Sequence, residues 1–178
     1  MTPTHYAAGL GNDKFKLLIK YGGDVNTYGG ANSFSTPFIW ALSNDRTENI
    51  ITMLNEAYVI EPDSVNGFDP ALVSAIRYED FEVIDILIEY GADINVVVSN
   101  PDVEWYCANP DKMTPLHVLA DVYSRSKNKE QIEHIILKFV QLGANINAEN
   151  AIGQTPLDFA KCNNDTSMIR ILIQNGAK

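Results

Sequence analysis

Two short sequence signatures recur along this chain of 178 residues, and their recurrence limits the fold more than any other feature. One is an opening of the type Thr-Pro-Leu-His, and the other is a closing of the type Gly-Ala-Asp-Ile-Asn. The openings begin at positions 2, 36, 70, 114 and 155, so they lie 34, 34, 44 and 41 residues apart. A chain that repeats a unit of this size buries its apolar surface by packing each copy against the next.

The signatures vary in quality from copy to copy. The opening is clearest at residues 114–117 (Thr-Pro-Leu-His) and degenerate at 70–73 (Pro-Ala-Leu-Val), and the closing is clearest at 91–95 (Gly-Ala-Asp-Ile-Asn). In the second copy, Ala57 stands where the closing glycine is expected. Together they predict five repeats, at about residues 1–33, 34–67, 68–111, 112–152 and 153–178.

Each part of the unit has a physical reason. The threonine caps a first helix, and the proline suits its first turn, where an amide would have no partner. A second helix carries an apolar stripe, as at Val83, Ile84, Leu87 and Ile88. The closing glycine can adopt the left-handed conformation that ends a helix, and the Asp-x-Asn segment favours a turn.

A period of about 33 residues with these landmarks resembles the ankyrin repeat family. The resemblance covers nearly the whole chain and implies an all-α ankyrin-repeat solenoid of about five helix-turn-helix repeats with projecting hairpin or loop fingers, in one domain over residues 1–178. It implies a structural hydrogen bond for His5 and His117 within the opening turn. It also implies that ligands lie against the hairpin tips and the exposed side of the first helices.

Composition and charge exclude several classes of function. The net charge of −10, from 23 acidic and 13 basic residues, argues against nucleic acid or an anionic membrane as partner and favours a basic or mixed protein surface. No apolar run is long enough to span a membrane, and the first repeat begins at Thr2, so neither a span nor a signal peptide is expected.

The two cysteines, Cys107 and Cys162, fall in different repeats and form no Cys-x-x-Cys pair. This pattern predicts neither a zinc site nor a disulfide framework, and it favours a reducing, cytoplasmic setting. We expect Cys162 to be packed within a first helix or to lie on the concave side.

No pattern of catalytic residues is present. His5 and His117 occupy the opening turns, His134 precedes an apolar stripe, and no other residue completes a triad or a metal site with them. The glycine pairs are too short for a phosphate-binding loop. We therefore predict a monomeric protein that is not an enzyme and has no cofactor or metal.

The strongest candidate for a binding site is a long connection at residues 96–113. Two Asn-Pro-Asp turns flank a centre that holds Glu104, Trp105 and Tyr106, with Asp102 in the first turn. Trp and Tyr are frequent anchors at protein interfaces. The segment is either a finger that presents these side chains to a partner or a flap that folds back over the repeats.

The exposed side of the first helices is a second candidate. Tyr6, Trp40 and Phe159 fall at equivalent places, and Arg77 and Tyr78 lie one turn further along. These side chains either contact a partner or pack between repeats.

The fourth repeat carries extra residues at 121–130, with the cations Arg125, Lys127 and Lys129. They either lengthen the two helices or form a loop, and we expect disorder at the tip. The basic cluster is either a solvated surface or a docking patch.

Two functions follow from this sequence. The first is a non-enzymatic protein-interaction module that binds an unidentified protein through its concave groove and the finger. The alternative is a regulator of an enzyme, or an effector or inhibitor that an intracellular bacterium or a large virus delivers into a host cell; small ankyrin proteins with Asn-rich, irregular repeats resemble those found in such genomes.

Overall fold

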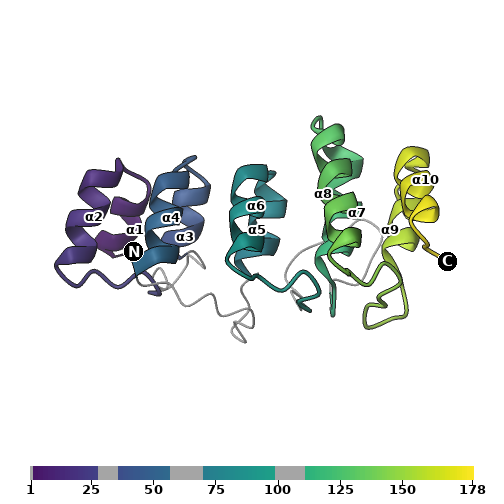
Figure 1. The fold of residues 1–178 in the computed structure, drawn as a ribbon, viewed down its shortest axis with the longest axis horizontal. Helices are drawn as coiled ribbons and strands as arrows, with labels where there is room; N and C mark the ends of the chain where they lie inside the picture. Colours follow the sequence, from purple (N-terminus) through teal and green to yellow (C-terminus); the bar gives the residue numbers. More distant parts are fainter. Residues whose placement is uncertain (1, 28–35, 57–69, 99–110) are drawn as a thin grey trace. The chain divides into compact units, whose positions relative to one another are not determined.

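The computed structural model describes residues 2–27, 36–56, 70–98 and 111–178. These residues form ten α-helices in five consecutive pairs, one pair for each predicted repeat (Figure 1). The pairs are α1 (Pro3–Ala8) with α2 (Asn12–Lys20), α3 (Pro37–Leu42) with α4 (Thr47–Glu56), α5 (Ala71–Tyr78) with α6 (Phe81–Glu89), α7 (Pro115–Arg125) with α8 (Lys129–Gln141), and α9 (Pro156–Cys162) with α10 (Thr166–Gln174). The prediction of an all-α repeat fold is confirmed.

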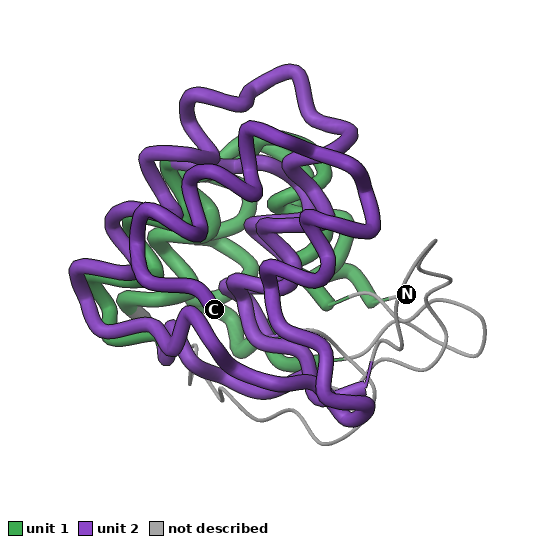
Figure 2. The backbone as a smooth tube through the Cα atoms, turned by 90° about the vertical axis from the view of Figure 1, so that its right-hand side faces the viewer, with its two compact units in different colours: residues 1–61, 82–92 green, residues 62–81, 93–178 purple. Residues whose placement is uncertain are grey.

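The chain divides into two compact units (Figure 2). Unit 1 holds residues 1–61 and 82–92, and unit 2 holds residues 62–81 and 93–178. In unit 1, α1 packs on α2 and α3, and α4 packs on α2 and α3. In unit 2, α7 packs on α5, α8 and α9, and α9 packs on α10.

The first helices begin as the sequence predicts. Thr36 precedes α3 in an extended conformation, and its Oγ1 accepts a hydrogen bond from the amide of Ile39 at 3.3 Å. Small residues then allow close packing with neighbouring helices. The alanines of this set are all buried: Ala7, Ala8, Ala41, Ala75, Ala120 and Ala160.

The closing glycines have the predicted left-handed backbone. Their φ angles are 85° at Gly22, 83° at Gly91, 92° at Gly143 and 99° at Gly176. In the turn that follows, the Asp93 carboxylate accepts a bond from the amide of the residue two positions later, at 2.8 Å. The closing of the second repeat, at residues 57–60, lies outside the described residues.

Asparagine side chains connect consecutive closing turns in unit 2. The side chain of Asn95 donates to the carbonyl of Gly143 at 3.4 Å and accepts from the amide of Asn145 at 2.8 Å. Asn147 makes the same two bonds to the closing of the fifth repeat, at 3.2 and 2.9 Å. This asparagine ladder therefore links repeats three, four and five.

The extra residues of the fourth repeat lengthen its helices. Helix α7 continues to Arg125, and α8 starts at Lys129. The connection is held by Glu79 of the third repeat, whose carboxylate accepts bonds from the Ser126 hydroxyl at 2.6 Å and from the Asn128 side chain at 2.8 Å. The expected disorder at the tip is wrong, because this long-range anchor binds two polar side chains of the insertion.

A second set of contacts joins α8 to its neighbours. The buried Tyr123 donates to Glu133 at 2.6 Å, and its ring lies under the ammonium of Lys129, 4.3 Å from the ring centroid. Lys129 also pairs with Asp165 of the fifth repeat at 2.8 Å. Arg125 pairs with Asp121 at 3.1 Å. Two cations of the basic cluster, Lys129 and Arg125, thus form ion pairs within the protein.

Candidate partner-binding surfaces

Tyr6 and Trp40 form an aromatic pair on the first helices of unit 1. Their ring centroids are 5.5 Å apart, and the ring planes are tilted by 54°. Tyr6 is 57% exposed and Trp40 is half-buried. Both residues were predicted to bind a partner, and the structure brings them together within reach of solvent.

The loop after α1 fits closely against this pair. A Cβ on Gly9 would lie 3.2 Å from Nδ2 of Asn44 and 3.6 Å from Cε3 of Trp40. Asn44 in turn donates from Nδ2 to the carbonyl of Trp40 at 2.8 Å. A side chain at Gly9 would make an ordinary contact with Trp40 but would require the Asn44 amide to move by a few tenths of an ångström.

In unit 2, charged residues lie on the first helices one turn beyond the places equivalent to Tyr6 and Trp40. Tyr78, at the end of α5, is 49% exposed, and the neighbouring Arg77 is half-buried. Burial raises the pKa of the Asp121 carboxyl, while Arg125, Arg77 and the side chain of Asn163 oppose this shift. Asp121 thus interacts with side chains from three consecutive repeats, and the repeat spacing had placed Arg77, Asp121 and Asn163 in one row.

The aromatic row does not continue as an exposed stripe. Phe159 occupies the place equivalent to Tyr6, but it is buried and packs edge-on against His117, with ring centroids 5.2 Å apart. Ser74 and Val118, in the same row, are also buried. For Phe159 the packing interpretation is correct, so Tyr6 and Trp40 differ from the rest of their row.

Only the base of the finger at residues 96–113 is described. Val98 and Met113 form an antiparallel bridge with two N–H···O bonds of 2.8 Å, and both side chains are buried. The predicted anchors lie outside the described residues: Asp102, Glu104, Trp105 and Tyr106.

His117 has the structural role that the resemblance implied. Its Nδ1 accepts from the amide of Thr114 at 3.1 Å, and its Nε2 donates to the carbonyl of Gln154 at 3.0 Å. Both bonds require the neutral ring with its proton on Nε2, because a carbonyl can only accept. Burial lowers the pKa of His117, against the opposing effects of Gln154 and Asp158.

Cys162 differs in part from its prediction. Its side chain is exposed, which rules out the packed alternative but not a place on the concave side, and it is disulfide-bonded, which the sequence did not predict. The lack of a Cys-x-x-Cys pair therefore did not exclude a disulfide at Cys162. Cys107, the other cysteine of the chain, lies outside the described residues.

The described ranges hold neither a metal-binding cluster nor a membrane-spanning helix. Within residues 2–27, 36–56, 70–98 and 111–178, no three His, Cys, Asp or Glu side chains are grouped so that they could hold a metal ion. In that part of the chain, every helix is too short or too polar to cross a membrane.

Comparison with known proteins agrees with the geometry of the repeats. Residues 5–98 match the model of three consecutive ankyrin repeats, and residues 152–178 match the model of a single ankyrin repeat. The chain is also similar to ankyrin repeat proteins of fowlpox virus (strain NVSL). It is 28% identical to FPV031 over 92% of this chain, and 33% identical to FPV244 over 71% of it.

These relatives are much longer proteins. The chain spans 44% of the length of FPV031 and 16% of the length of FPV244. The structure has threonine before four of its first helices and a left-handed glycine at four closings. The chain therefore belongs to the ankyrin repeat family.

Proposed function

We propose that this chain is a non-enzymatic protein-interaction module that holds its partner along the exposed side of the first helices and at the finger of residues 96–113. Ankyrin repeats in general mediate contacts between proteins. The observation that carries the proposal is the partly exposed pair of Tyr6 and Trp40. The equivalent places in unit 2 hold buried residues, so the fold does not require exposed aromatic rings there.

The proposed contact residues have the chemistry of interface anchors. Aromatic residues and arginine contribute most of the binding energy at typical interfaces, because they bury a large area and still offer a polar group. The first-helix set consists of Tyr6, Trp40, Arg77 and Tyr78, and the finger set of Asp102, Glu104, Trp105 and Tyr106. The net charge of −10 favours a partner surface with basic groups.

A second candidate role is that of an effector or inhibitor that a virus produces in its host. The similarity to fowlpox virus proteins supports this role. The partner would then be a host protein, and the chain would act as a monomer in the host cytoplasm.

The experiment is an affinity capture from avian-cell lysate, followed by mass spectrometry. Four baits are compared: the native chain, Tyr6→Ala with Trp40→Ala, Trp105→Ala with Tyr106→Ala, and the control Tyr21→Ala, which alters an exposed tyrosine beyond the second helix. We expect a protein that the native chain and the control retain and that both double variants lose while still folded. Equal capture by all four baits would overturn the proposed site.

A further inference from the structure

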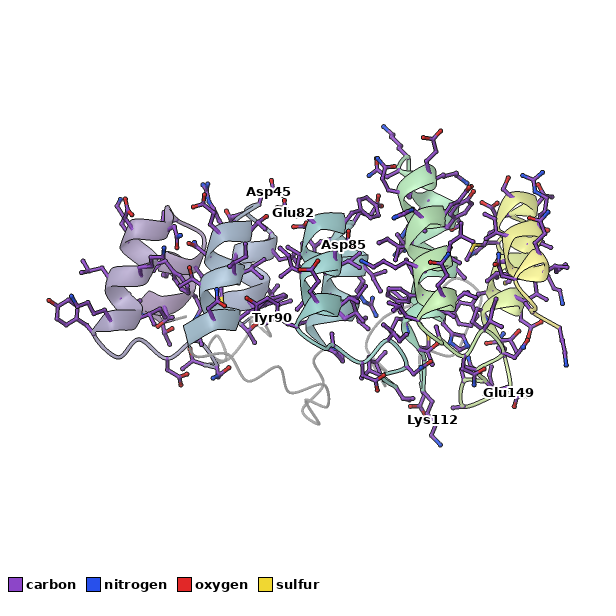
Figure 3. All side chains as sticks on the ribbon, viewed as in Figure 1. Asp45, Glu82, Asp85, Tyr90, Lys112 and Glu149 are labelled. Atoms are coloured by element: carbon purple, nitrogen blue, oxygen red, sulfur yellow. The ribbon has the colours of Figure 1, made fainter. Side chains whose placement is uncertain are left out.

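From the start of the opening to the residue before the second helix, the first repeat is one residue shorter than repeats two, three and five: Gly11 follows Thr2 by nine positions, whereas Arg46, Asp80 and Asp165 follow Thr36, Pro70 and Thr155 by ten. In those repeats a left-handed residue separates the helices, at Asp45 (labelled in Figure 3), Glu79 and Asn164, with φ of 53°, 56° and 53°. The amide of that residue donates to the carbonyl three positions earlier, at 3.3, 3.1 and 3.0 Å. The first repeat has extended Gly11 at this point, and the equivalent carbonyl, that of Ala8, receives no such bond.

A side chain from the second repeat makes the missing bond. Asn49 is 1% exposed, and its Nδ2 donates to the carbonyl of Ala8 at 2.8 Å and to that of Leu10 at 2.8 Å. A side-chain amide has two N–H donors, so both are used. The carbonyl of Gly9, between these two acceptors, accepts from Nε of Arg46 at 3.2 Å.

The position of Asn49 shows that this bonding is unusual for the fold. At the same place in later second helices stand Val83, Ile135 and Met168, all buried and apolar. A buried amide is costly unless its donors are bonded. The short loop of the first repeat supplies acceptors for both donors of Asn49, whereas its buried Oδ1 has no hydrogen-bond partner among the described residues.

The loop at residues 9–11, to which Asn49 and Arg46 donate hydrogen bonds, also lies against the aromatic pair of Tyr6 and Trp40. Gly9 lies against Trp40, and Tyr6 belongs to the helix that ends at this loop. A shift of the loop relative to α3 would change the contact of Tyr6 with Trp40. The hydrogen bonds of Asn49 and Arg46 oppose such a shift.

We propose that Asn49 is a positioning residue that replaces the missing loop residue of the first repeat and thereby holds Tyr6 against Trp40. The short loop of repeat one and Asn49 of repeat two are then matched, because the carbonyls of one bond the donors of the other. The importance of this contact for binding rests on the proposed function, whereas the matched pairing itself does not.

The pairing is tested by rescue. We expect Asn49→Val to lower the folded-to-unfolded ratio on the order of 100-fold in urea unfolding, because two carbonyls lose their donor. Insertion of one asparagine between Leu10 and Gly11 restores the loop pattern of the fifth repeat, and it should recover most of that loss. The control is Thr52→Val, which removes a 3.1 Å bond from the same helix to Asn12 and should not be rescued. An equal loss for Asn49→Val with and without the insertion would overturn the pairing.

The positioning role needs a second measurement. In a Trp105→Phe background, Trp40 is the only tryptophan, and its emission reports on the aromatic pair. We expect folded Asn49→Val to shift this emission to longer wavelength and the insertion to reverse the shift. Unchanged emission would overturn the positioning role. If rescue and emission behave as expected but no protein is captured through Tyr6 and Trp40, the proposed function fails and the pairing stands.

Discussion

The Nε2 atom of His117 lies 3.0 Å from the carbonyl oxygen of Gln154, so one imidazole joins the opening turns of repeats four and five. The other ring nitrogen accepts the amide of Thr114. Protonation of the ring would place a hydrogen on Nδ1, where an amide hydrogen already points. The neutral ring is therefore part of the folded state.

This geometry predicts that stability falls in mildly acidic solution. The pKa of folded His117 is lowered, so the unfolded chain takes up a proton first as the pH drops through 6.5. The stabilisation is complete above that pH and decreases below it. His117→Ala should lower the free energy of unfolding by about 2 kcal/mol at pH 7.5. In urea unfolding, the free energy of unfolding of this variant should depend less on pH between pH 7.5 and pH 5 than that of the native chain. The same slope in the variant would contradict the assignment.

The fifth repeat makes the same turn with the carboxylate of Asp158 in place of a neutral histidine ring. Oδ2 of Asp158 accepts from the amide and the hydroxyl of Thr155, both at 2.9 Å. The bond from the Thr155 amide holds the pKa of Asp158 below its ordinary value of 3.8. Its stabilisation is present above that value and is lost as the pH falls through the lower folded pKa.

Asp158→Ala should accordingly cost about 1 kcal/mol at neutral pH. The difference from the native chain should shrink below pH 3.8. Urea unfolding at pH 7 and pH 3 measures this difference in the free energy of unfolding. Lys161→Met is the control, because it removes the 3.6 Å ion pair to Asp158 and keeps the cap. A difference that is equal at both pH values would show that the cap acts without its charge.

The asparagine ladder predicts a loss of stability from a truncation on the protein surface. Asn147→Ala removes the two bonds to the closing of the fifth repeat and should cost about 1 to 2 kcal/mol. Amide hydrogen exchange should rise in α10 before other helices of unit 2. Gln141→Ala, at an exposed position of α8, is the matched control and should change stability by less than about 0.5 kcal/mol.

The tyrosine of the fourth repeat offers a conservative test of its lengthened helices. Tyr123→Phe keeps the buried ring and its contact with Lys129 but removes the 2.6 Å bond to Glu133. The expected cost is about 1.5 kcal/mol, because the acceptor is charged. Thermal unfolding at low and high salt measures it, and a variant as stable as the native chain would show that the bond adds nothing.

The parts of the fold that depend on local sequence were predictable. Threonine and proline mark four of the five first-helix starts, and glycine marks four of the five closings. These residues act through their own backbone or through amides three residues away. The histidine of the opening turn followed from the family resemblance. Lys112 and Glu149 lie on the side of the closing turns in unit 2 (Figure 3).

The parts that depend on the next repeat were not predictable from one sequence. Asn49 bonds to carbonyls about 40 residues earlier, and Glu79 accepts from an insertion nearly 50 residues later. No local pattern distinguishes these side chains from solvated ones. Tyr6 and Trp40 could be named from equivalent positions, but their pairing required the packing of α1 on α3.

The central claim is that a protein partner lies against the exposed side of the first helices, and site-specific photocrosslinking tests it most directly. A photoreactive phenylalanine is placed at Tyr6, at Tyr78 or, as the matched control, at Tyr21, all of which are exposed tyrosines. The proposed function predicts that positions 6 and 78 crosslink to one captured protein and that position 21 does not. Crosslinks from position 21 alone would place the partner on the second helices and contradict it.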